Sequence, residues 1–201
     1  MRSMTAALRS NVPDIAHVGA DPLSNLDSAA FGQRLTNAIA HNVPRMHLGK
    51  VLISETPYGS DDPTTVRIVN GDPATRIEAA TFVDRHDLAI VEFELGTFGG
   101  YDGDDVLDLV WRLHCPVMTV LHSIPAYPDR HLRSVLEELA YRSDAVVVLS
   151  HSAHDRLLTH YMVEPASIYV IPYGIHQNSR LPSTSKAAGR PTIFTWGILD
   201  R

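Results

Sequence analysis

Short apolar runs, bounded by polar, glycine or proline residues, recur along the chain. The two strongest are Leu88–Phe93 and Val117–His122. The stretch between them carries apolar residues at helical spacing, namely Val106, Leu107, Leu109, Val110 and Leu113. Runs this short and this rich in branched aliphatic side chains are typical of strands buried on both faces. The pattern therefore predicts two parallel strands joined by a helix through a right-handed crossover.

The same alternation continues on both sides of this unit. Further strands are predicted at Ile15–Gly19, Lys50–Ser54, Val66–Val69, Ala145–Leu149 and Ile168–Ile171. Helices are predicted at Ser28–His41, Asp72–His86 and Asp129–Arg142, and from His151 onward. Asp27 or Ser28 is expected to cap the first helix, and Ser152 with Asp155 has the capping-box spacing for the last. The fold class that follows is α/β, with a Rossmann-like, doubly wound and mainly parallel sheet.

The ends of the chain differ in composition from its centre. Residues 1–14 are polar and poorly patterned, which predicts a loose terminus. Residues 15–177 are expected to form one domain. Residues 178–191 hold serines, basic residues and prolines but few apolar side chains, which is typical of a linker. Residues 192–201 open with a new apolar run and are expected to be the first strand of a truncated second domain, because a lone strand cannot bury both of its faces.

Polar and small residues gather after the two central strands. Ligands of a doubly wound sheet bind outside the carboxyl ends of the strands, and here those ends carry Glu92–Gly100 and His122–Pro125. The imidazole of His122 can exchange one hydrogen bond with a ligand hydroxyl. The alternative is a core histidine that the backbone satisfies.

The loop after the first central strand offers further candidates. Gly96, Gly99 and Gly100 let the backbone approach a ligand closely, unless they serve only a turn. Glu94 can accept hydrogen bonds from hydroxyl groups. Glu92, on the same side of the strand, would complete a glycosidase-like pair of carboxylates, but neighbours on one strand seldom bracket a bond from opposite sides. One of the two is instead expected to bond backbone amides of its own loop.

Ser150 ends a strand in front of a helix, where a helix N-terminus favours anions and hydroxyl groups. Capping that helix is an equally good use of its side chain. The neighbouring His151, His154 and His160 suggest a metal site, but no third ligand with matching geometry accompanies the first two. A solvated helix start is therefore favoured, and no metal is predicted.

Composition and missing motifs disfavour several classes of function. The net charge of −6 disfavours nonspecific nucleic-acid binding, and no run approaches the ~20 apolar residues of a membrane span. The first residues lack a secretory pattern and Cys115 is the single cysteine, so we expect a protein of the reducing cytoplasm. P-loop, serine-hydrolase and zinc-ribbon motifs are missing. No G-x-G-x-x-G follows Ile15–Gly19, which disfavours a nicotinamide-dependent oxidoreductase.

Several segments in a fixed order resemble one family. The run SDAVVVLSHSAHDRLL, the later SIYVIPYGI, a polar linker and TIFTWGIL look like the retaining GT-B glycosyltransferases of family 4. The upstream segments, from Asp72 to Ser150, are similar to one bacterial branch of that family. The resemblance is good over Asp72–Arg201 and loose over residues 15–71.

The resemblance implies two Rossmann-like domains that face each other across a cleft. The N-terminal domain receives the acceptor, and residues 192–201 would begin the missing C-terminal domain, which binds a nucleotide-sugar donor. A hexose would pass to a sugar, lipid-linked or small-molecule hydroxyl acceptor with retention of configuration. The donor phosphate would take the acceptor proton, with no metal or other cofactor. Peripheral association with a membrane stays open, because many relatives glycosylate lipids, and the 201-residue chain alone is expected to be inactive.

Individual residues match the family's motifs. The resemblance assigns His122 to a contact with the donor sugar near the reacting centre, Tyr173 and Gly174 to the turn before the interdomain linker, and Gly197 to the loop near the donor phosphates. Ser24 and Asn25 match the first loop, which is glycine-rich in many members but has no glycine here. The identity of the acceptor is therefore undecided. The alternative function is a noncatalytic α/β module that binds a ligand or a partner.

Overall fold

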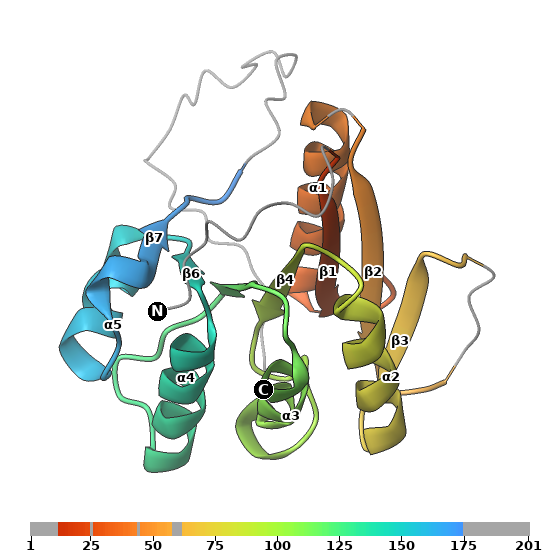
Figure 1. Ribbon diagram of the computed structural model, residues 1–201. Helices are drawn as coiled ribbons and strands as arrows, with labels where there is room; N and C mark the ends of the chain where they lie inside the picture. Colours follow the sequence, from red (N-terminus) through yellow and green to blue (C-terminus); the bar gives the residue numbers. More distant parts are fainter. Residues whose placement is uncertain (1–11, 25, 44, 58–61, 175–201) are drawn as a thin grey trace, which may run out of the picture.

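The computed structural model describes residues 12–24, 26–43, 45–57 and 62–174, which form one seven-stranded sheet with helices on both faces (Figure 1). The strands are β1 (Asp14–Ala20), β2 (His47–Ser54), β3 (Thr65–Val69), β4 (Leu88–Phe93), β5 (Val117–Leu121), β6 (Ala145–Val148) and β7 (Ile168–Val170). The helices are α1 (Asp27–Asn42), α2 (Pro73–Val83), α3 (Asp105–Arg112), α4 (Arg130–Arg142) and α5 (His151–His160), with the short 3-10 helices η1 (Tyr101–Gly103) and η2 (Pro165–Ser167). The predicted α/β class is confirmed.

The strand order reverses once, in the middle of the sheet. All neighbouring strands are parallel, in the order β3-β2-β1-β4-β5-β6-β7. The order reverses between β1 and β4, and doubly wound sheets bind ligands outside the carboxyl ends of the strands at such a switch point. Phe93 lies opposite Leu121 in the β4–β5 pairing. The loops that follow these two residues therefore leave the sheet at the same edge.

The two faces of the sheet are covered unequally. Helices α2, α3 and α4 lie in a row on one face (Figure 1) and enclose the larger core. Helix α1 lies on the other face, over a smaller cluster centred on Ile90, Val120 and Val147. Alternate residues of a strand point to opposite faces, so Val91 belongs to the larger core while Glu92, the next residue, points to the α1 side.

Helix ends were predicted with mixed success. Asp72 caps α2 as expected, since its carboxylate accepts a hydrogen bond from the amide of Ala74 at 3.0 Å. The capping box that begins at Ser152 is wrong. Ser150 caps α5 instead, and its Oγ accepts from the amide of Ala153 at 3.1 Å. Strand β6 ends earlier than the apolar run suggests, so the cap lies before the predicted position.

Leu139 of α4 tests the larger core, because its side chain is fully buried there. Replacing it with alanine removes apolar contacts and leaves a cavity, so we expect Leu139→Ala to lower the free energy of unfolding by about 2–5 kcal/mol. The matched control is Leu158→Ala in α5, where the side chain is 41% exposed and the expected loss is below about 1 kcal/mol. Urea unfolding followed by circular dichroism measures both, and equal losses would contradict this assignment of the core.

Candidate functional site

A buried carboxylate lies between two histidines at the switch point. Glu92 of β4 is 1% exposed. Its Oε1 lies 2.7 Å from Nε2 of His17 in β1, and its Oε2 lies 3.2 Å from Nε2 of His122, which follows β5. Side chains from three adjacent strands thus meet at one carboxylate, on the face of the sheet that α1 covers. We define His17, Glu92 and His122 as the histidine–glutamate cluster.

The two histidines keep the carboxylate charged. Burial alone would raise the pKa of Glu92, but the hydrogen bonds from His122 and His17 outweigh burial and hold this pKa below its ordinary value of 4.5. Glu92 is therefore ionised at neutral pH. An ionised carboxylate at this depth would be strongly destabilising without such partners, so the cluster stabilises the fold as well as shaping the site.

A glycine lets α1 approach the histidine–glutamate cluster. A Cβ at Gly32 would lie 3.0 Å from Oε1 of Glu92 and 3.0 Å from Cε1 of His17. Glycine inside a helix is less favourable than alanine by about 1 kcal/mol, and here it allows close packing. The preceding residue, Phe31, meets the ring of His122 edge-on, with 4.9 Å between the centroids. Helix α1 therefore covers the histidine–glutamate cluster on this face of the sheet.

His122 makes a second polar contact through its other nitrogen. Its Nδ1 lies 2.8 Å from the hydroxyl of Tyr173, just beyond β7. The imidazole is 2% exposed and Tyr173 is 47% exposed, so the tyrosine separates the histidine from solvent. Phe31 packs edge-on against Tyr173 as well. Two predicted site residues from distant parts of the sequence, His122 and Tyr173, are thus in direct contact.

Glu94 lies at the amino end of α1. Its Oε2 accepts a hydrogen bond from the amide of Ser28 at 3.1 Å. Helix α1 has Leu26 at the cap position, and within the described part of the chain the hydroxyl of Ser28 has no hydrogen-bond partner, so the predicted capping by Ser28 is wrong. The side chain of Asp27, the other predicted cap, lies outside what the structure describes. The amide that Glu94 binds belongs to α1 and not, as predicted, to its own loop. A carboxylate is favourable here because a helix N-terminus exposes unpaired N–H groups and carries positive partial charge.

The glycines of the β4–α3 loop have structural reasons to be glycine. Gly96 and Gly100 have φ angles of 85° and 83°, a region that disfavours other residues. The amide of Gly99 donates to Oδ1 of Asn70 at 2.9 Å, and a Cβ at this position would lie 2.7 Å from Oδ2 of Asp105. The turn alternative accounts for Gly96 and Gly100, and the close approach of Asp105 at the start of α3 accounts for Gly99. Contact of this loop with a ligand stays a prediction.

The loop after β1 is held by its own hydrogen bonds. The amide of Ser24 donates to the carbonyl of Asp21 at 2.8 Å, and Oγ of Ser24 accepts from the amide of Leu26 at 3.5 Å. Asp21 is buried and forms an ion pair with Arg67 of β3. Ser24 therefore lies at the switch-point edge, as the sequence match placed it.

The remaining candidate residues either have a local structural role or lie outside the described part of the chain. Ser150 caps α5, which supports the capping alternative. Gly174, which the resemblance assigns to the turn before the linker, has no φ in the left-handed region, and among the described residues no heavy atom would lie within 4 Å of a Cβ at this position. Asn25 and Gly197 lie outside the described residues.

Sequence reasoning missed His17 and treated Glu92 only as half of a carboxylate pair. That pair is ruled out as two free carboxylates, because histidines bind both oxygens of Glu92. The sequence contained one signal that could have found the contact between Glu92 and His17. A charged residue inside an otherwise apolar, doubly buried strand needs a buried partner, and His17 is the polar residue of the strand predicted at Ile15–Gly19.

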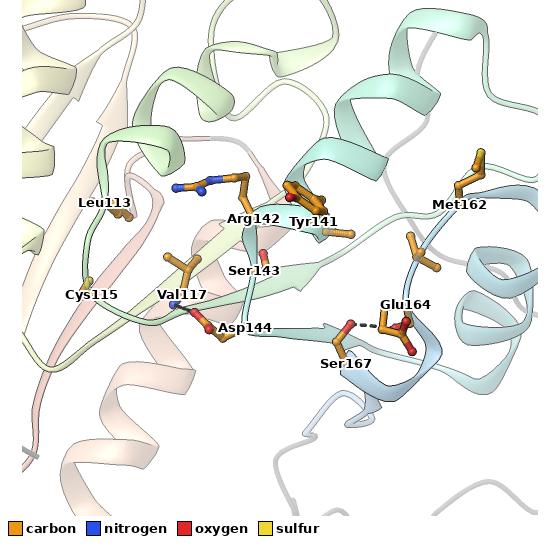
Figure 2. Close-up of a pocket in the computed structure, with 12 residues that line it drawn as sticks. Leu113, Cys115, Val117, Tyr141, Arg142, Ser143, Asp144, Met162, Glu164 and Ser167 are labelled. Carbon is orange, nitrogen blue, oxygen red and sulfur yellow. Dashed lines mark hydrogen bonds between the residues drawn. The ribbon is translucent and has the colours of Figure 1, made fainter. Parts of the chain in front are cut away.

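A separate cavity of about 450 Å³ opens at the opposite edge of the sheet (Figure 2). It is lined by residues that precede β5, β6 and β7, among them Cys115, Asp144 and Glu164. Two of its polar side chains serve the fold, since Asp144 accepts from the amide of Val117 at 3.0 Å and Ser167 donates to the carbonyl of Glu164 at 2.8 Å. Ligands of this fold class bind at the carboxyl edge, so we place the candidate site at the histidine–glutamate cluster.

Two negative findings apply to the part of the chain that the structure describes. There, no group of three or more histidine, cysteine, aspartate or glutamate side chains is arranged to hold a metal ion. Within the same part, no helix is long and apolar enough to cross a membrane.

Comparisons with known proteins point to one family. The model of Glycosyltransferase Family 4 matches residues 67–178, whereas no curated protein matches the sequence. A solved alpha-glucosyltransferase, in complex with UDP and a 13-mer DNA containing a central A:G mismatch, is 14% identical, with a TM-score of 0.53 over 78% of this chain and 40% of that one. A glycosyltransferase from Rickettsia africae ESF-5 is 16% identical, with a TM-score of 0.54 over 87% of this chain and 47% of that one. The chain thus spans less than half the length of either structure, and the likeness shows the shared fold.

The charge on Glu92 predicts a pH-dependent contribution to stability. In the unfolded chain Glu92 regains its ordinary pKa of 4.5, so the unfolded state takes up the proton first as the pH falls. The stabilisation is therefore complete above about pH 4.5 and is lost below it, as the pH passes through the lower native value. We expect Glu92→Gln to lower the free energy of unfolding by about 1–3 kcal/mol at pH 6, and by progressively less towards pH 3.

Urea unfolding at several pH values measures this difference. The control is Glu78→Gln on the exposed side of α2, which should change stability little at any pH. A deficit in Glu92→Gln that stays constant down to pH 3 would contradict the predicted ionisation of Glu92.

Proposed function

This chain belongs to Glycosyltransferase Family 4, and from that membership we propose that it forms the acceptor-side half of an enzyme that transfers a hexose from a nucleotide-sugar to a hydroxyl group. The observation that carries the proposal is the position of His122. It lies within the matched segment, beside the switch point, with one ring nitrogen bonded to a hydroxyl group. Histidine at such an edge is suited to bind sugar hydroxyls.

The proposed reaction is a substitution at the anomeric carbon with retention of configuration. The bond from this carbon to the donor phosphate oxygen breaks, and a bond to the acceptor oxygen forms. The acceptor proton passes to the leaving phosphate, so the chemistry requires no metal ion or other cofactor. His122 would contact the donor sugar. The loop residues Glu94, Gly96, Gly99 and Gly100, together with Ser24, Asn25 and Ser150, are proposed to line the substrate side.

A second domain is part of this proposal. The chain covers 40% and 47% of the two solved structures, so we propose that residues 178–191 link it to a donor-binding domain that begins at residues 192–201, with Tyr173, Gly174 and Gly197 near the hinge and the donor. Transfer depends on positioning and on electrostatic stabilisation from both walls of a cleft. One wall alone then contributes little to the rate.

Location and partners belong to the same proposal. We propose a cytoplasmic enzyme that takes a sugar, a lipid-linked group or a small molecule as acceptor, with peripheral membrane association in the lipid-linked case. The net charge of −6 is unfavourable for binding nucleic acid, so no nucleic-acid partner is proposed.

One observation favours the alternative of a noncatalytic binding module. Both ring nitrogens of His122 already have partners in the chain, and the imidazole is 2% exposed. A protein that had kept the fold without the chemistry could retain this arrangement for stability. Saturable binding of a sugar without any turnover by the full-length protein would support the module over the enzyme.

A screen of nucleotide-sugars with the full-length protein tests the enzyme. We expect hexose transfer from at least one donor, and a loss in kcat/KM of about 100-fold or more in His122→Ala, comparable to removing one transition-state hydrogen-bond partner. The control is His41→Ala at the exposed C-terminal end of α1, which should retain wild-type activity. Equal activity of His122→Ala and wild type would remove His122 from the site.

The proposed need for both domains is tested with the 201-residue chain itself. We expect this chain to release or transfer no radiolabelled hexose from a donor that the full-length protein uses, because half of the stabilising contacts are missing. Product analysis by chromatography gives the measurement. Appreciable turnover by the isolated chain would contradict the proposed division of labour between the domains.

A further inference from the structure

The partners of His122 determine which of its nitrogens carries the proton. An ionised carboxylate can only accept hydrogen bonds, so the Nε2 atoms of His17 and His122 are both donors to Glu92. This assignment follows from the hydrogen-bond network. When the imidazole of His122 is neutral, its proton is on Nε2 and a lone pair is on Nδ1. That lone pair points to the hydroxyl of Tyr173, which then donates its proton across 2.8 Å.

We infer that Glu92, anchored by His17, is a positioning residue that holds His122 with Nδ1 as a hydrogen-bond acceptor for a substrate hydroxyl. The inference deepens the proposed function and rests on it. The hydroxyl of Tyr173 shows within the chain which chemical group Nδ1 accepts from. A sugar hydroxyl would take the place of that hydroxyl, whereas a phosphate oxygen, which has no proton to donate, would face the lone pair unfavourably.

The histidine–glutamate cluster is more deeply buried than the other histidine–carboxylate pairs. Glu92 and the two histidine side chains are each 5% exposed or less. In the part of the chain with described side chains, every other such pair leaves at least one partner 35% or more exposed. Water can satisfy either tautomer of an exposed histidine, whereas the cluster offers both of its histidines only a carboxylate acceptor at Nε2.

The packing prevents the carboxylate from releasing His122. Each oxygen of Glu92 serves one histidine, so a rotation that freed His122 would also break the bond to His17. A Cβ at Gly32 would come within 3.0 Å of the cluster, which shows that α1 leaves no room above the carboxylate. Phe31 fixes the plane of the imidazole from the side. These constraints direct Nδ1 towards the exposed end of the site, where Tyr173 lies.

The tautomer of His122 is measurable without any assay of activity. Nitrogen-15 NMR of the labelled chain distinguishes a protonated Nε2 from a protonated Nδ1, and we expect the Nε2–H form at neutral pH. In Glu92→Gln the amide offers one acceptor oxygen and one donor nitrogen, so it cannot accept from both histidines. At least one of the two histidines, His17 or His122, should therefore lose its Nε2–H form in that variant.

Two further variants serve as controls for the tautomer. Asp84→Asn removes a carboxylate from another histidine, His114, away from the cluster, and should leave His122 unchanged. Tyr173→Phe removes the hydroxyl partner but keeps Glu92, so the Nε2–H form should persist. A protonated Nδ1 of His122 in wild type, or the Nε2–H form kept by both His17 and His122 in Glu92→Gln, would overturn the inference, and so would a tautomer change in Tyr173→Phe.

Kinetics of the full-length protein separate positioning from general stability. We expect kcat/KM to be about 10- to 100-fold lower in Glu92→Gln than in wild type. In the double variant, adding Glu92→Gln to His122→Ala should cause no further loss, because the effects of neighbouring residues that act through one group are not additive. Asp84→Asn should be as active as wild type. Losses that multiply in the double variant would overturn the positioning role.

The tautomer and the activity can fail separately. If the full-length protein transfers no hexose while His17 and His122 both show the Nε2–H form and Glu92→Gln abolishes it in one of them, the proposed function is wrong and the positioning by Glu92 is supported. If transfer occurs but the tautomer does not depend on Glu92, the function stands and this inference is overturned.

Discussion

The charge of Glu92 is the constraint on which the rest of the site depends. A carboxylate that is 1% exposed must be paired, because an unpaired buried charge costs several kcal/mol. Its partners come from the strands on either side, so β1, β4 and β5 must be neighbours and in register for the chain to fold. The same order creates the switch point at which this fold class binds ligands. The interaction that stabilises the sheet and the one that shapes the site are therefore the same.

This coupling explains features that a binding role alone does not. Gly32 weakens α1 as a helix, yet it permits the close approach that keeps water from the carboxylate. Glu94 satisfies the amino end of the same helix, so two acidic residues of one strand and its loop fix where α1 lies. Tyr173 reaches His122 from beyond the edge strand β7. The position of one imidazole thus depends on both sides of the switch point and on the segment that leads to residue 178.

Local patterns in the sequence were sufficient for the elements and for part of the site. Apolar runs were sufficient to locate the seven strands, of which β1, β4, β5 and β6 are buried on both faces, and His122 was found because it directly follows one of them. The cluster was not found because its members lie 75 and 30 residues apart. Strand order decides which of these residues meet, and alternation along single strands does not contain that order. The predicted capping of α1 by Ser28 failed for a similar reason, since Glu94 reaches this helix from another element.

The charges at the carboxyl edge indicate which part of a substrate this wall can bind. Glu92, Glu94 and Asp21 are acidic, and Arg67 is already paired with Asp21. Carboxylates and a neutral imidazole nitrogen accept hydrogen bonds, and sugar hydroxyls donate them. A diphosphate only accepts and carries negative charge, so the same edge repels it. Under the proposed function, the two ends of a nucleotide-sugar would therefore require different surroundings, and this edge would suit the hydroxyl-rich end and not the phosphates.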